Sequence, residues 1–372
     1  MKRFLIALTI VLILPFSAFA VEETSYDELL SSYDLSMFDS ELNEETKELL
    51  SELGLDDFDY TAISSLSFQN VCEIIGKILK GKLETPLKSA VSILVFILLS
   101  ALFKSLRTDD SEDLGGVYST CAALLISVIL VAKMSPAISL AASSVKLAGS
   151  FVFAFVPVFC AIVVASGGIT TSFSTNTMLL ILSQGLTFIS SNIFMPIINC
   201  FLAIGICSSL SAELNLGNLL NTLKKGITTF ISVLCAVFVS ILSMKTTISA
   251  RADALGIRSV RFVINSVVPV IGGSISEGLL SINSYSSLIK SSVGIVGIIA
   301  IALLFLPSIA EIVLWRIILS LSSLVSELFD DREVSNVLRA FKDTALMINV
   351  VLILSMVTTV ISFGILIAAR TV

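Results

Sequence analysis

The sequence contains no histidine, and only 14% of its 372 residues are charged. Histidine is the commonest general base and metal ligand near neutral pH, so its absence excludes Ser-His and Cys-His catalytic pairs. The six cysteines form no Cys-x-x-Cys pair, and the chain has neither a phosphate-binding glycine loop nor paired catalytic carboxylates. We therefore predict that the protein is not an enzyme and has no cofactor and no metal site.

The scarcity of charge also bounds the fold, because soluble domains carry about 25% charged residues. In this chain 55% of residues are hydrophobic, and apolar runs recur along most of it. A membrane-spanning helix needs about 20 apolar residues. The pattern predicts an all-α, polytopic membrane helix bundle over residues 87–372, embedded in the lipid bilayer. The predicted apolar runs are 87–103, 117–132, 147–165, 177–194, 195–211, 226–244, 262–275, 293–306, 308–328 and 345–369, with 133–146 as a polar connector.

The N-terminus has the layout of a signal peptide over residues 1–20. Met1-Lys2-Arg3 is basic, an apolar core follows, and Ala18-Phe19-Ala20 fits a cleavage site. An uncleaved first anchor is the alternative. Either arrangement places the mature N-terminus outside the cytoplasm.

An acidic extracytoplasmic segment is expected over residues 21–67. Between Val21 and Tyr60 there are fourteen Asp or Glu residues and one basic residue, Lys47. Short amphipathic helices and a disordered acidic spacer are both compatible with this composition. Its acidity argues against nucleic acid as a partner. Residues 68–86 then alternate apolar and charged positions at helical spacing, which predicts an amphipathic helix on the membrane surface.

Prolines and glycines interrupt the apolar runs in a pattern that repeats. Pro157 and Pro196 lie 39 residues apart, and Pro269 and Pro307 lie 38 apart. We infer an internal duplication, with repeat 1 at about 117–225, repeat 2 at about 226–342 and a final span at 345–369. Duplicated units with broken helices are typical of transporters. The candidate structural or functional breaks, which plain kinks would also explain, are Pro157, Gly167, Gly168, Pro196, Pro269, Gly272, Gly273 and Pro307.

Basic residues bear on the orientation of the two units. Lys104 and Arg107 favour a cytoplasmic end for the span at 87–103. The basic loop at 245–261 and the pair Lys224-Lys225, one span apart, cannot both be cytoplasmic. If the loop at 245–261 is cytoplasmic, the two copies are inverted.

Two charged residues fall inside the apolar run 308–328. Glu311 and Arg316 are candidate intramembrane charges, because such residues are costly and commonly functional. They are about 140° apart around a helix, so they are not expected to pair with each other. Alternatively, the helix is interfacial, with Trp315 in the aromatic belt.

The order of several apolar motifs resembles the stage III sporulation protein AE family. The resemblance covers about residues 87–370 and is carried by 150–157 (SFVFAFVP), 165–168 (ASGG), 192–196 (NIFMP), Leu219-Leu220, 261–263 (RFV), 268–272 (VPVIG) and 290–295 (KSSVGI). It implies a multi-pass subunit of the channel, or feeding-tube, complex that joins mother cell and forespore. The implied location is the mother-cell membrane around the forespore, with an ATPase and ring-forming membrane proteins as partners.

Two readings of function therefore remain open. The resemblance implies a channel-complex component needed for endospore development, with no catalytic motif to carry over. The repeat and the proline interruptions instead suggest a stand-alone secondary transporter or permease.

Overall fold

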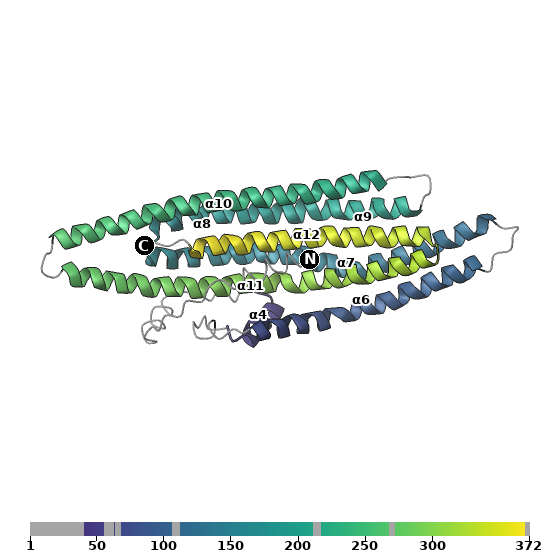
Figure 1. Ribbon diagram of the computed structural model, residues 1–372, viewed down its shortest axis with the longest axis horizontal. Coiled ribbons are helices and arrows are strands. Elements are labelled where there is room, and N and C mark those ends of the chain that lie inside the picture. Colours follow the sequence, from purple (N-terminus) through teal and green to yellow (C-terminus); the bar gives the residue numbers. More distant parts are fainter. Residues whose placement is uncertain are drawn as a thin grey trace.

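The computed structural model describes residues 41–55, 63, 68–105, 112–210, 217–267 and 272–368 of the protein, which form a long helical bundle (Figure 1). Six helical segments among these residues are long and apolar enough to cross a membrane. The prediction of an all-α polytopic bundle is therefore confirmed. The described elements are α4 (Glu44–Glu52), α6 (Phe68–Ser105), α7 (Glu112–Ala165), α8 (Ile169–Ile189), the π-helix η1 (Ser190–Phe194), α9 (Met195–Leu210), α10 (Gly217–Val267), α11 (Gly272–Leu328) and α12 (Arg332–Ala368).

The helices lie side by side as a broad bundle with two distinct edges. Helix α11 packs along α12, α7 and α6, whereas α10 packs on α12 and α8. Helices α10 and α6 consequently form opposite edges of the bundle, with α7, α11 and α12 between them (Figure 1). Helix α4 lies against the α6 and α11 side.

The bundle is much longer than a bilayer is thick. Helix α11 has 57 residues and α7 has 54, which at 1.5 Å per residue is about 80 Å or more. The hydrocarbon core of a membrane is only about 30 Å thick. A single bilayer therefore covers part of the length of these helices.

A ladder of aromatic rings fills the centre of the bundle. Phe151, Phe155 and Phe159 recur every four residues on one face of α7, with successive ring centroids 5.3 and 5.6 Å apart. Phe363 of α12 packs 5.5 Å from Phe155. On α11, a Cβ at Gly297 would lie 2.8 Å from the Phe155 ring. Glycine at this position therefore lets α11 approach the ladder closely, which favours tight helix packing in a membrane.

Most of the prolines lie inside continuous helices. Helix α6 passes through Pro86, so the stretch expected at the membrane surface and the following span form one helix. Helix α7 passes through Pro136 and Pro157, and α11 passes through Pro307. Neighbouring helices in a bundle supply partners for the backbone groups that a proline frees.

The polar connector predicted at 133–146 was wrong, because these residues continue α7. Ala137 and Ala141 are buried, and the Ser144 hydroxyl hydrogen-bonds the Ser308 hydroxyl of α11 at 2.6 Å. Small residues here allow close contact between helices, a function that composition alone does not distinguish from a loop.

Pro196 differs from the other prolines because the backbone changes ahead of it. Residues Ser190–Phe194 form a π-helix, and α9 begins at Met195. Insertions of this kind widen the helix by one residue, which gives the proline ring room where it would meet the preceding turn. The Asn192 side-chain amide of η1 donates to the Phe188 carbonyl of α8 at 3.1 Å.

Several predicted features fall outside the described residues. These are the signal peptide at 1–20, Pro269 and most of the acidic segment. Within that segment, α4 is an amphipathic helix whose Asn43 side chain accepts a hydrogen bond from the Thr46 amide and whose Leu49 and Leu50 are buried. The duplication stays a prediction. At one pair of matched positions the two copies differ, since Pro196 follows a π-helix whereas Pro307 lies within an unbroken α-helix.

Candidate functional site

Buried charged groups, rather than a metal cluster, mark the candidate site. Within the described ranges no three His, Cys, Asp or Glu side chains gather as metal ligands. Among the described residues, the buried charged side chains are those of Asp253, Lys290 and Asp331. Asp253 and Lys290 interact electrostatically, and Asp331 lies at the other end of the bundle.

The turn between α7 and α8 prepares the first of these places. Helix α7 ends at Ala165, and the Gly168 amide donates to Val163 O while the Gly167 amide donates to Val164 O, both at 2.9 Å. This is a Schellman cap, which needs a left-handed residue just past the helix. Gly167 supplies it with φ of +87°. The chain then reverses directly into α8 at Ile169.

Asp253 of α10 caps the start of α8 from a distant part of the chain. Its two carboxylate oxygens accept hydrogen bonds from the amides of Thr170 at 2.6 Å and Thr171 at 2.7 Å. These amides belong to the first turn of α8, where helices leave donors unsatisfied and carry partial positive charge. Gly168, at the N-cap position of α8, has no side chain to satisfy them. Asp253 therefore replaces the missing local cap.

Lys290 of α11 brings a positive charge to the same end of the bundle. Its side chain is buried, with 4% of its surface exposed, and Asp253 is 6% exposed. The two groups attract each other electrostatically. One end of the bundle thus joins α8, α10 and α11 through a carboxylate, two helix amides and an ammonium, which we call the polar junction.

Unsatisfied hydroxyls lie close to the junction in sequence. The Oγ1 atoms of Thr171 and Thr175, in the first two turns of α8, are buried and have no hydrogen-bond partner in the described structure. The Ser172 hydroxyl is satisfied, since it donates to Cys160 O at 2.9 Å. The junction can therefore fix the α7–α8 hairpin to α10, and it provides free acceptors and donors at the start of α8.

A small cavity lies further along the bundle, between α7, α8, α11 and α12. Its lining combines apolar groups with the hydroxyl residues Ser183, Thr187, Ser355 and Thr359. Gln184 Nε2 donates to Gly149 O beside it at 3.0 Å. Hydroxyl side chains that hydrogen-bond between membrane helices stabilise the helix contact by roughly 1 kcal/mol each. Here they also give the cavity a polar wall.

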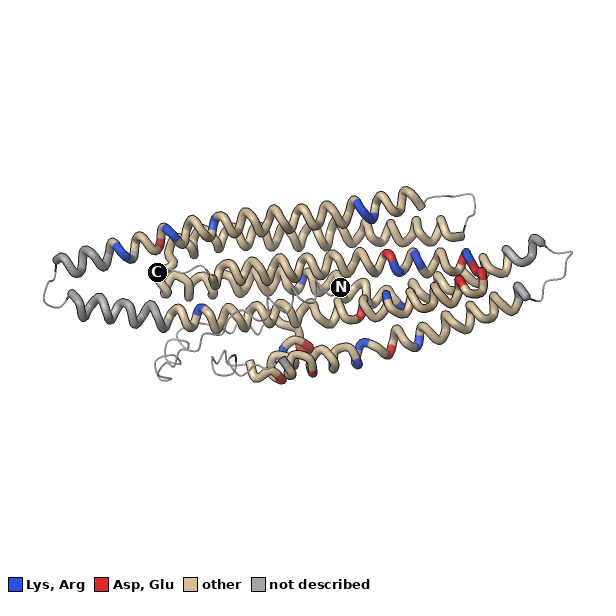
Figure 2. Tube along the Cα trace, in the orientation of Figure 1, with Lys and Arg blue, Asp and Glu red and all other residues tan. Residues whose placement is uncertain are grey.

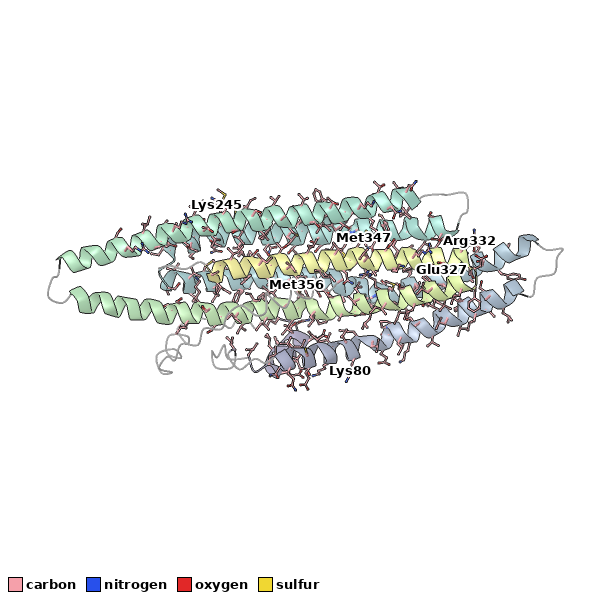
Figure 3. The ribbon with its side chains drawn as sticks, viewed as in Figure 1. Lys80, Lys245, Glu327, Arg332, Met347 and Met356 are labelled. Carbon is pink, nitrogen blue, oxygen red and sulfur yellow. The ribbon has the colours of Figure 1, made fainter. Side chains whose placement is uncertain are left out.

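The opposite end of the bundle is held by a second acidic residue. Asp331 ends the α11–α12 turn, and its carboxylate accepts hydrogen bonds from Ser100 of α6 and Ser119 of α7. Near it, Arg339 donates to Glu327 at 2.6 Å, across the α11–α12 hairpin. Figure 3 shows Glu327 and Arg332 together at this end. This arrangement ties four helices together.

The structure separates the predicted intramembrane charges. Glu311 is partly buried on α11, and its electrostatic neighbours are Lys82 of α6 and Glu45 of α4. It does not pair with Arg316, as the helical spacing predicted. Trp315 is fully buried inside the bundle, so the alternative that it belongs to an aromatic belt at the membrane surface was wrong.

The candidate breaks that fall within the described residues lie on several different elements. Pro157 lies within α7 and Pro307 within α11, Gly167 and Gly168 form the α7–α8 turn, Pro196 follows η1, and Gly272 and Gly273 begin α11. Sequence reasoning missed Asp253, although its isolation among Lys245, Arg251 and Arg258 was a usable signal. In the sequence, Lys290 belongs to the motif at 290–295, which does not mark it as a buried charge.

Comparison with known proteins gives a consistent family assignment. Stage III sporulation protein AE of Bacillus subtilis (strain 168) is 24% identical over 187 residues, which cover 50% of this chain and 47% of that protein. The chain thus matches about half the length of this curated relative. No solved structure matches the chain. The family model for stage III sporulation protein AE matches residues 59–370, and the protein therefore belongs to the stage III sporulation protein AE family.

Proposed function

We propose that this chain is an integral membrane component of the sporulation channel complex that links mother cell and forespore and is needed for endospore development. Membership of the family supports a role in sporulation. The observation that carries the proposal is this membership, combined with six helices long enough to span a membrane. A structural and conducting role also fits a chain without histidine, for which we propose no enzymatic activity.

The proposed setting follows the same reasoning. The chain lies in the mother-cell membrane around the forespore, with its mature N-terminus outside the cytoplasm. Its partners are an ATPase and ring-forming membrane proteins of the same complex. The two polar ends of the bundle, at Asp253 and Asp331, hold its helices in a fixed arrangement on which such partners can assemble.

Isolation of the complex tests this proposal. The chain is tagged, and membranes are solubilised with mild detergent from cells that have completed engulfment. We expect the ATPase and the ring-forming proteins to co-purify with the tagged chain and not with a tagged, unrelated multi-pass protein of the same membrane. Recovery of the chain alone, from cells in which all partners are present, would contradict the proposal.

A stand-alone transporter is the second candidate, and one specific observation favours it. Asp253 and Lys290 are buried charges within the candidate spans, and ionisable residues in such positions commonly mark substrate or proton paths. The test is purified protein in liposomes, with and without the partner subunits. Gradient-driven solute uptake by this chain alone, lost in Asp253→Asn, would favour the transporter, whereas inactivity without partners favours the channel component.

A further inference from the structure

One hydrogen bond and one electrostatic interaction indicate the level of α6 relative to α11. Lys82 is an electrostatic neighbour of Glu311, and Ser100 hydrogen-bonds Asp331 just beyond the end of α11. The two helices therefore run in parallel, with each α6 residue level with the α11 residue numbered about 230 higher. Lys77 and Lys80 lie level with the stretch of α11 around Leu306 and Ile309. This part of α6 is thus beside the middle of α11.

That level lies within a slab of the bundle that contains no charged residue on three helices. Helix α11 has none between Lys290 and Glu311, and α10 has none between Lys225 and Lys245. Helix α12 has none after Asp343. Stretches of about 20 residues span about 30 Å, which is the thickness of one hydrocarbon core. We place the bilayer at this slab.

The cavity shows that the three helices share the level. Phe305 of α11 and Ser355 and Thr359 of α12 line it together. The thiol of Cys235, on α10, lies 4.0 Å from the carbonyl of Leu354, next to the cavity on α12. The middle of α10, the middle of α12 and the α11 stretch beside Lys77 therefore lie at one depth.

The two edges of the bundle have opposite character at this depth. On α10, Phe230, Val233 and Val237 are 59%, 56% and 50% exposed. On α6, the side chains of Lys77 and Glu84 are 56% and 71% exposed. Figure 2 shows charges clustered along α6 and α4, and a tan stretch through the middle of α10. Lys80 points away from the bundle at the α6 edge (Figure 3).

Helix α4 adds to the charged edge. It docks about halfway along the bundle, where Lys82 of α6 lies 3.1 Å from Glu45 and Lys77 pairs with Glu52. The Glu44 side chain is 91% exposed. We call α4 together with residues 68–88 of α6 the charged flank. Its exposed charged residues are Glu44, Glu48, Glu52, Glu73, Lys77, Lys80, Glu84 and Lys88.

Lipid cannot cover the charged flank at low cost. Each charged side chain at the centre of a bilayer costs about 3 kcal/mol even on the mildest scale, and several are exposed here. The α10 edge, in contrast, presents the side chains that lipid accepts. We propose that the charged flank lines a water-filled path through the membrane, closed by the same flank of further copies of this chain. This proposal rests on the channel function and names the surface that conducts.

A second copy is the occupant that the charges favour. The flank carries both signs, with acidic residues on α4 interspersed with Lys77, Lys80 and Lys88 on α6. A surface of mixed sign is complementary to a copy of itself under rotational symmetry. A strongly acidic or basic partner would leave one set of charges facing its own sign.

Water accessibility tests the path directly. In a background without the six native cysteines, single cysteines replace Lys77 or Lys80 on the flank and Val233 or Val237 on α10. Asp330, in the exposed α11–α12 turn, gives a fully accessible reference. Permeabilised membranes containing the complex are treated with a permanently charged, water-soluble methanethiosulfonate. Methanethiosulfonates react with the thiolate, which forms where water reaches the thiol. We therefore expect the reaction rates at positions 77 and 80 to lie within about tenfold of the rate at 330. The rates at 233 and 237 should be at least about 100-fold lower than at 330.

Two outcomes would overturn the path. Reaction at 77 and 80 as slow as at 233 and 237 would show that the flank is sealed from water. Equal, fast reaction at all four positions would show that the slab lies outside the bilayer. The spore yield of each variant is recorded separately. If the proposed channel function is wrong, a strain without the chain will sporulate normally, whatever the labelling pattern.

Cross-linking tests the identity of the other walls. A bifunctional maleimide long enough to span a water-filled gap should join Lys80→Cys, Lys77→Cys and Glu84→Cys into dimers on a denaturing gel. Val237→Cys on the opposite edge should remain monomeric. Absence of a dimer with all three flank variants, each labelled normally by the soluble reagent, would contradict closure by further copies.

Discussion

Removing the carboxylate of Asp253 should destabilise the bundle more than any other single truncation at its polar ends. Asp253→Ala removes two hydrogen bonds, from Thr170 and Thr171, to a residue that is only 6% exposed. It also removes the anion that offsets the buried Lys290 ammonium. Hydrogen bonds to a charged group contribute about 1.5–3 kcal/mol each, so the two together set the expected loss at about 3–6 kcal/mol.

The conservative substitution should cost less. In Asp253→Asn the amide oxygen still accepts from one α8 amide, but the charge and the second acceptor are lost. We expect about half the loss of the alanine variant. Arg251→Ala, two residues away on an exposed part of α10, serves as the control and should change stability by no more than about 0.5 kcal/mol.

Thermal unfolding of the detergent-solubilised protein, followed by size-exclusion chromatography, measures these effects. At about 2 °C per kcal/mol, a value for domains somewhat smaller than this chain, Asp253→Ala should lower Tm by about 6–12 °C. Asp253→Ala combined with Lys290→Met should recover part of this loss, because both buried charges are then absent. An alanine variant as stable as Arg251→Ala, or a double variant no better than the sum of its parts, would refute the junction.

Three further substitutions test the packing. Gly167→Ala forces a side chain onto a backbone with φ of +87° and should lower the free energy of unfolding by about 1–2 kcal/mol. Gly185→Ala, with open space around it, is the control and should be neutral or stabilising. Equal Tm values for the two variants would contradict the capped turn. Gly297→Ala places a Cβ 2.8 Å from Phe155 and should lower the free energy of unfolding by about 1–3 kcal/mol. Gly226→Ala, which meets nothing within 4 Å, is the control and should not. A neutral Gly297→Ala would show that the phenylalanine ladder rearranges to accept the methyl group. Asp331→Ala removes the acceptor for Ser100 and Ser119 and should lower Tm more than the neighbouring, exposed Asp330→Ala, with the reverse order as the contradicting result.

The membrane bundle was predictable because one property of the sequence, the length of its charge-free apolar runs, decides it. Charge-free runs of membrane-spanning length, such as the stretch between Lys225 and Lys245 on α10, are visible in the sequence. The distribution of small residues was less informative. Residues 133–146 have the composition of a polar connector, yet they belong to α7, and Ala137 and Ala141 are buried in the bundle, because small residues serve both loops and close helix contacts.

The prolines show a second limit of local reasoning. A proline removes one backbone donor wherever it lies, but the surrounding helices decide what the backbone does. Pro157 and Pro307 remain inside regular helices, whereas Pro196 follows a π-helix. Polar residues precede Pro196 and apolar residues precede Pro157 and Pro307, but this difference alone does not predict a π-helix, since partners for freed backbone groups come from other parts of the chain.

The polar junction could not be predicted because it is assembled by tertiary structure. Asp253 caps a helix that begins more than 80 residues earlier, and Gly168 provides the reason by having no side chain of its own. Lys290 reaches the same place from a third helix. Only the Schellman turn at Gly167-Gly168 was marked locally, by the two adjacent glycines.

Deletion of the chain from its sporulating host tests the central claim most directly. Engulfment and heat-resistant spores are scored in the deletion strain, in the strain restored with the native chain, and in the parent. A component of the channel complex predicts that engulfment is completed, that heat-resistant spores fall by orders of magnitude, and that the native chain restores them. Normal numbers of heat-resistant spores in the deletion strain would contradict the account.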